Sequence, residues 1–127
     1  MIIIDIFIKS IDYFCFMIFK LDHTKNKNAH IIKDLFYASY TVEAKILGVI
    51  DFPPLNRNVS HFTSSNSFFY AYCINNNIVG LIEVNIEHDV VHIQSLVVDP
   101  EYFRQGIAKK LIRFIFNMYE FSCFTVE

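Results

Sequence analysis

The chain has 127 residues, of which 54% are hydrophobic and 17% aromatic, and its formal net charge at pH 7 is −2. This length predicts one domain with a buried core, and the apolar composition excludes a disordered chain. Because the 11 basic and 13 acidic residues form no basic stripe, we expect no nucleic-acid partner.

The three cysteines are far apart in the sequence: Cys15, Cys73 and Cys123. They include no CxxC pair, so the sequence predicts neither a metal site nor a disulfide framework. Reduced, buried thiols are typical of a cytoplasmic protein, which is the location we expect.

The first 15 residues form a strongly apolar stretch. Asp5, Lys9 and Asp12 interrupt it, so we expect no transmembrane segment, and it lacks the basic start and cleavage site of a signal peptide. The charges recur at helical spacing, which favours a mostly buried helix, while the many Ile and Phe residues equally allow a strand. A weak anchor on a membrane surface is a further alternative. We therefore treat residues 1–15 as an apolar N-terminal extension.

A long helix is predicted after a polar loop. Apolar residues recur with a helical period over residues 31–47, Asn28 is a candidate N-cap, and Gly48 is a natural C-terminal end. Two consecutive prolines exclude regular structure from residues 51–58.

Three strands joined by short turns follow. They cover Phe68–Ile74, residues 78–86 and Val90–Val98, and the Asn and Asp residues between them tolerate the left-handed backbone of hairpin turns. Alternation places five residues on one face of the second strand: Ile78, Gly80, Ile82, Val84 and Ile86. Residues 121–126 also have the composition of a strand.

The last strand of this meander runs into a loop and a helix. Pro100 cannot donate a hydrogen bond to a sheet, so the strand ends by Asp99. Residues 107–119 carry apolar side chains on one helical face and mostly charged side chains on the other, and Gly106 opens this helix. The unpaired N–H groups and the positive dipole end of a helix start, with Arg104 beside them, suit a phosphate or pyrophosphate.

This stretch resembles the acetyl-CoA-binding motif of the GNAT superfamily of N-acetyltransferases. Its parts are Leu-x-Val-x-Pro at residues 96–100, Arg-Gln-Gly-Ile-Ala at 104–108 and Lys-Lys-Leu-Ile at 109–112. The family pattern is Gln/Arg-x-x-Gly-x-Gly/Ala after a strand. Gly106 and Ala108 match its last two fixed positions, and Phe103 stands where Gln or Arg is usual.

The resemblance implies an α/β (α+β) fold of GNAT type over residues 16–127. It places a first strand at Phe16–Leu21, makes strands 2 to 4 antiparallel and strand 5 parallel to strand 4, and sets helices on the faces. Relatives continue through a further helix and two more strands, so the C-terminal part of the fold would be missing. The exposed edge of strand 5 would then invite a partner, either a second copy in a homodimer or another chain.

The same resemblance implies a site for acetyl-CoA, with no metal, where strands 4 and 5 splay apart. Backbone groups of strand 4 would hold the pantetheine arm, a strand-4 N–H (that of Val97 or Val98) would serve the developing oxyanion, and the loop before the last helix would hold the pyrophosphate. The predicted acetyl-CoA-binding residues are Leu96, Val97, Val98, Phe103, Arg104, Gln105, Gly106, Ile107 and Ala108. The loop with two prolines would be either a wall of the acceptor pocket or a plain connector.

Two residues are candidates for the general base. His92 stands six residues before Val98, where the histone-modifying branch of the family carries its base, and its ordinary pKa suits the role. Glu83 on the neighbouring strand is the second candidate. The alternatives are a strand histidine without catalytic duty, a carboxylate on a solvated face, and deprotonation through water.

Two functions remain open from the sequence. The first is an N-acetyltransferase that transfers an acetyl group from acetyl-CoA directly to a primary amine of a small molecule or protein. The second is a catalytically inactive or fragmentary relative that acts as a CoA-binding or structural protein. The near-neutral charge selects no acceptor.

Overall fold

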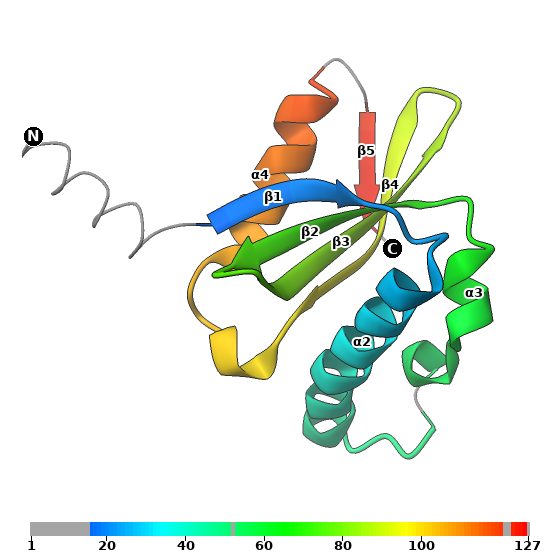
Figure 1. Cartoon of the computed structure of the whole chain (residues 1–127), viewed down its shortest axis with the longest axis vertical. Coiled ribbons are helices and arrows are strands. Elements are labelled where there is room, and N and C mark those ends of the chain that lie inside the picture. The colour runs from blue at the N-terminus through cyan, green and yellow to red at the C-terminus, as the bar shows by residue number, and fades with distance from the viewer. Residues whose placement is uncertain (1–15, 52, 121–122, 127) are drawn as a thin grey trace, which may run out of the picture.

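The computed structural model describes residues 16–51, 53–120 and 123–126, which form a five-stranded mixed sheet with helices on its faces (Figure 1). The strands stand in the order β1 (Phe16–Leu21), β2 (Phe68–Ile74), β3 (Asn77–Glu87), β4 (Val90–Val98) and β5 (Cys123–Val126). Strands β1 to β4 are antiparallel, and β5 is parallel to β4. The predicted mixed sheet is thus confirmed, while the N-terminal extension lies outside the described residues.

Two hydrophobic cores cover the two faces of the sheet. Alternate residues of β2 point to opposite faces, so Phe69 and Ala71 pack with α2 (Asn26–Leu47), whereas Tyr70 and Tyr72 pack with α4 (Ile107–Met118). The first core also contains Phe62 from α3 (Val59–Thr63). None of the helices in the described part of the chain is long and apolar enough to cross a membrane.

Helix α2 begins earlier than predicted. Its first residue is Asn26 and its N-cap is Lys25, so the predicted cap at Asn28 is wrong. The Asn28 amide instead donates to the carbonyl oxygen of Asp22 in the preceding loop, at 2.9 Å. The predicted end is confirmed: Gly48 has a φ of 67°, and its N–H donates to carbonyls of the last turn.

The segment with two prolines is ordered into short helical turns, so the expectation of no regular structure there is wrong. A 3₁₀ helix, η1, covers Pro53–Asn56, because the fixed φ of proline is compatible with a first helical turn. Asn58 then caps α3: its side chain accepts the N–H of His61 at 3.1 Å, and the His61 ring accepts the N–H of Asn58 at 3.0 Å. Five residues are too few for helical periodicity to reveal α3.

Two irregularities in pairing decide which side chains reach each face. Between β3 and β4, Glu83 pairs with Ser95 while Val84 pairs with Ile93, so Gln94 is an extra residue in β4. Before this bulge odd-numbered residues of β4 pack toward α4, and after it even-numbered residues do.

A second bulge lies between β2 and β3 and changes which residues of β3 share a face, so the predicted face of β3 is partly wrong. Gly80, Ile82 and Val84 lie on the α4 face as predicted. Ile78 packs with the core beneath α2, because the pairing shifts between Gly80 and Ile78, and Ile86 is 40% exposed.

Gly80 permits close approach of α4 to the sheet. A Cβ at this position would lie 2.8 Å from Cγ2 of Ile107, in the first turn of α4. We expect Gly80→Ala to lower the free energy of unfolding by about 2 kcal/mol, as overpacking does, measured by urea denaturation. Ile107→Ala should recover part of this loss in the double variant; additive losses would contradict the contact.

Candidate functional site

The N-terminus of α4 presents unsatisfied backbone N–H groups. Gly106, the N-cap, has a φ of 77°, and no side chain caps the helix. Arg104, two residues earlier, also has a positive φ, of 66°. Left-handed residues that alternate with ordinary ones turn successive N–H groups to one side, and such a concavity binds anions.

A cavity of about 520 Å³ lies over this helix start. Its lining includes Ser39 of α2 and Leu96 of β4. Of the predicted acetyl-CoA-binding residues it gathers all except Val97, whose side chain is buried on the α2 face, and Gln105, which is exposed. Arg104 and Lys109 are the basic residues of the lining.

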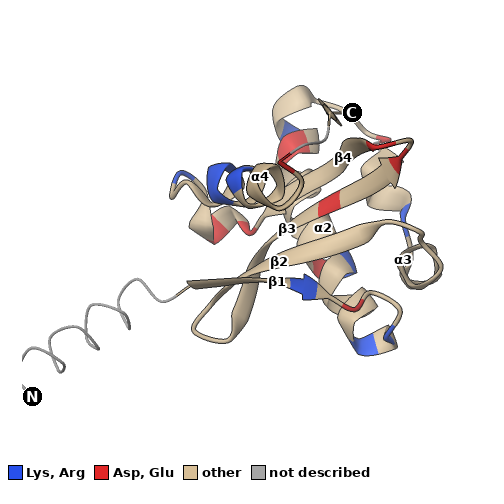
Figure 2. Cartoon of the chain, turned by 90° about the horizontal axis from the view of Figure 1, so that it is seen from above, with Lys and Arg blue, Asp and Glu red and all other residues tan. Residues whose placement is uncertain are grey.

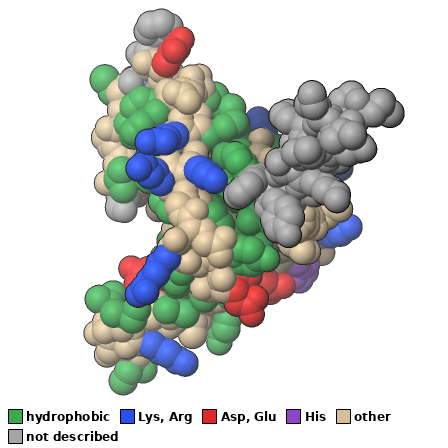
Figure 3. Space-filling view, turned by 90° about the vertical axis from the view of Figure 1, so that its left-hand side faces the viewer, with side chains coloured by type: hydrophobic (Ala, Val, Ile, Leu, Met, Phe, Trp, Pro, Cys, Tyr) green, Lys and Arg blue, Asp and Glu red, His purple; other side chains and the backbone are tan. Residues whose placement is uncertain are grey.

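Further Lys and Arg residues lie on α4 (Figure 2), and Lys and Arg side chains gather on one face of the molecule (Figure 3). Lys110 lies over the ring of Phe16, 4.5 Å from its centroid, and its ammonium is 3.4 Å from the Tyr72 hydroxyl. Arg113 is exposed and does not line the cavity. The positive charge of these Lys and Arg residues favours the binding of an anion at the start of α4.

A second cavity, of about 390 Å³, lies where β5 stops pairing with β4. The described part of β5 pairs only with Val90 to Ile93, and the bulge at Gln94 follows directly. The lining comes from both faces of the sheet: Tyr40, Glu43, Pro54, Ile93, Gln94, Ser95, Leu96, Ile112 and Val126. Leu96 lines both cavities, so they adjoin. The surface is hollowed between the cations over α4 and the lower end of the molecule (Figure 3).

The model of the acetyltransferase (GNAT) family matches residues 23–120. The chain belongs to this family. A curated relative, UPF0157 protein YqkA of Bacillus subtilis (strain 168), is 30% identical over 100 residues, which are 76% of this chain and 29% of that protein. This GNAT chain therefore spans less than a third of the length of that relative.

Solved structures show the same fold. The PaiA N-acetyltransferase from Thermoplasma acidophilum, in complex with coenzyme A, has a TM-score of 0.62 and 17% identity, covering 83% of this chain and 72% of that one. A possible acetyltransferase from Clostridium difficile 630 has a TM-score of 0.65, 19% identity, and coverage of 88% and 78%. An aminoglycoside acetyltransferase from an uncultured soil metagenomic sample, in complex with sisomicin, has a TM-score of 0.60, 23% identity, and coverage of 92% and 79%.

In this GNAT domain, Glu83 is a buried partner of an arginine. It is 2% exposed, and both its oxygens accept hydrogen bonds from Arg57, at 2.7 and 3.2 Å. The Arg57 guanidinium also lies over the rings of Phe62 and Phe36, 4.3 and 5.5 Å from their centroids. The alternative of a solvated Glu83 is therefore wrong, and its side chain does not line the cavity at the β4–β5 gap.

His92 connects the last two strands. Its Nδ1 forms a hydrogen bond with the hydroxyl of Thr125 in β5, beside it in the parallel register. The His92 side chain does not line the cavity at the β4–β5 gap either. A catalytic role for His92 or Glu83 stays a prediction.

The titratable side chains that do line this cavity come from α2, and the sequence analysis missed them. Tyr40 is half-buried; burial raises the pKa of its hydroxyl above the ordinary value, and a hydrogen bond with Ser95 acts in the opposite direction. Glu43, three residues on, is exposed. The signal in the sequence that could have revealed them is Glu43, a carboxylate at a position where the helical period predicts an apolar side chain.

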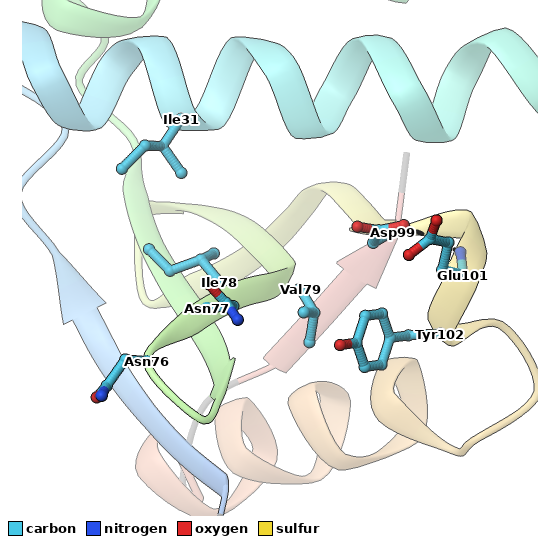
Figure 4. A pocket seen from close by; sticks show the side chains of 8 residues that line it. All are labelled: Ile31, Asn76, Asn77, Ile78, Val79, Asp99, Glu101 and Tyr102. Atoms are coloured by element: carbon cyan, nitrogen blue, oxygen red, sulfur yellow. Dashed lines mark hydrogen bonds between the residues drawn. The ribbon is translucent and has the colours of Figure 1, made fainter.

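A third cavity, of about 480 Å³, lies between α2 and the β2–β3 turn (Figure 4). Tyr102 lines it and also the cavity at the start of α4. One of its two carboxylates serves local structure: Asp99 accepts the N–H of Glu101 at 2.9 Å and so caps the 3₁₀ helix η2 (Pro100–Tyr102). We assign this cavity no function.

Proposed function

We propose that this domain binds acetyl-CoA and transfers its acetyl group directly to a primary amine of a small molecule or a protein. The observation that carries this proposal is the pair of adjoining cavities: one over a helix start lined with cations, the other at the gap between β4 and β5. The coenzyme A bound to the Thermoplasma relative supports it.

The first cavity fits the anionic part of acetyl-CoA. The pyrophosphate would lie against the backbone N–H groups at Gly106 and the first turn of α4, with Arg104 and Lys109 supplying charge. The pantetheine arm would follow the edge of β4 past Leu96, where no described residue of β5 pairs with that strand. Its amide groups would there meet backbone donors and acceptors.

The second cavity is where we place the transfer. The amine nitrogen attacks the thioester carbonyl, the new C–N bond forms, the C–S bond breaks, and the amine loses a proton while the thiolate gains one. A strand N–H of Val97 or Val98 would stabilise the oxyanion. The hydroxyl of Tyr40 lies in this lining, beside Ser95.

One observation favours the second function, a CoA-binding protein without turnover. Both predicted bases are engaged elsewhere, Glu83 with Arg57 and His92 with Thr125. Calorimetric titration with acetyl-CoA, followed by an assay of CoA release with a panel of amines, separates the two functions. Binding with turnover supports the transferase, binding alone supports the second function, and no binding contradicts both.

We expect Arg104→Ala to weaken acetyl-CoA binding about tenfold, because a charge-assisted contact to phosphate is lost. Arg113→Ala, on the same helix but away from the cavity, is the matched control and should bind as the wild type does. Equal losses in both variants would indicate only a general effect of net charge.

A further inference from the structure

A contiguous apolar surface is exposed at the C-terminal end of α2. It consists of Ile46, Leu47, Val49 and Ile50, whose exposed fractions are 79%, 60%, 42% and 104%. We call these residues the 46–50 patch. Large apolar side chains grouped in this way mark interaction sites on proteins.

The patch continues the wall of the cavity at the β4–β5 gap. Tyr40 and Glu43 line that cavity, and Ile46 and Leu47 lie three and four residues beyond Glu43, on neighbouring positions of the helix surface. The chain then passes through Val49 and Ile50 to η1, whose Pro54 lines the same cavity. Figure 1 shows this end of α2 projecting below the sheet, and Figure 3 shows hydrophobic side chains at that lower end.

Glu43 gives the mouth of this cavity a negative charge. It is the one acidic residue of the lining, and no hydrogen bond or ion pair joins its carboxylate to another described residue. The charge of Glu83, by contrast, is matched by Arg57. The mouth is thus complementary to an ammonium group that is followed by apolar groups.

We propose that the acceptor is a polypeptide whose ammonium group binds at Glu43 and whose adjacent apolar side chains cover the 46–50 patch. This inference rests on the proposed function and names its substrate class. A small amine would fit within the cavity of about 390 Å³ and leave the patch bare. A polypeptide can fill the cavity with one group and reach Ile50 with the next residues.

The test measures peptide binding and so needs no turnover. A labelled short peptide with a free N-terminus and with Leu and Phe at its second and third positions is titrated into the CoA-loaded protein. Its affinity should exceed that of the same peptide with Ser at both positions by about tenfold, as expected when the two apolar side chains are only partly buried on an open surface. Acetylating the peptide N-terminus should weaken binding to the wild type but not to Glu43→Gln.

The double variant Leu47→Ser/Ile50→Ser should lose the preference for the apolar peptide while retaining wild-type affinity for CoA. Met17→Ser is the matched control: Met17 is 60% exposed, as Leu47 is, but lies on β1 at the opposite edge of the sheet, so the preference should persist. Three results would overturn the proposal. They are equal binding of both peptides, a preference for the apolar peptide that survives in the double variant, and binding to amine-headgroup vesicles without any peptide binding. Failure of the proposed function would appear separately, as loss of CoA binding or of CoA release.

Discussion

Gly106→Val should weaken acetyl-CoA binding by roughly 30-fold or more, while the sheet stays folded. The φ of Gly106 is 77°, a conformation that costs a β-branched residue the most. A Cβ there would meet no atom within 4 Å, so the effect is backbone strain rather than a clash. Relief of that strain would turn the first N–H groups of α4 away from the cavity. Calorimetry with acetyl-CoA measures the loss, and circular dichroism checks the fold.

Gly48→Val is the matched control for this experiment. Gly48 also has a positive φ, of 67°, and also has no atom within 4 Å of a Cβ position, but it ends α2. The two variants should lose comparable stability, and only Gly106→Val should lose CoA affinity. If Gly106→Val binds like the wild type, or both variants lose affinity alike, the anion site does not lie at Gly106.

Arg57→Met should lower the free energy of unfolding by about 3 kcal/mol. The substitution leaves the buried carboxylate of Glu83 without the two hydrogen bonds that balance its charge in the interior. It also removes the guanidinium from the rings of Phe62 and Phe36. Urea denaturation should show a lower midpoint with an unchanged slope.

The double variant Arg57→Met/Glu83→Gln distinguishes a structural from a catalytic Glu83. Removal of both charges should restore most of the stability, because an uncharged amide is less costly to bury. If Arg57→Met alone changes stability by less than about 0.5 kcal/mol, the pair behaves like a surface salt bridge. Acetyl transfer at the wild-type rate by the double variant would exclude Glu83 as the general base.

The elements that the sequence predicted well carry local signals. Strands β2 and β4 have the predicted limits because Asn residues and Pro100 end them, and α4 begins where Gly106 predicts. The cap at Asn28 failed because its side chain bonds backward to the preceding loop. Local signals therefore located the start of α4 and the loop before it, which hold most of the predicted cofactor residues.

The features that escaped prediction depend on distant pairing. Arg57 and Glu83 are 26 residues apart, and no periodicity in the sequence reveals that the arginine pairs with the buried glutamate. The bulge at Gln94 arises from the register between two strands. Tyr40 and Glu43 reach the cavity only because α2 packs against β4, which follows it by some 40 residues or more in the sequence. The acceptor side of the site was consequently less predictable than the cofactor side.

The extra residue in β4 has a consequence for variation in length. Before Gln94, the odd-numbered residues Val91 and Ile93 pack in the core beneath α4. After it, the odd-numbered Val97 packs in the core beneath α2. Deleting Gln94 would restore regular alternation and leave both faces as they are, because Ile93 and Ser95 would then be direct neighbours that still pair with Val84 and Glu83. A sequence comparison with an unbulged strand that places no gap at Gln94 would therefore misassign the faces for half of β4, and an engineered deletion of Gln94 should leave the domain folded.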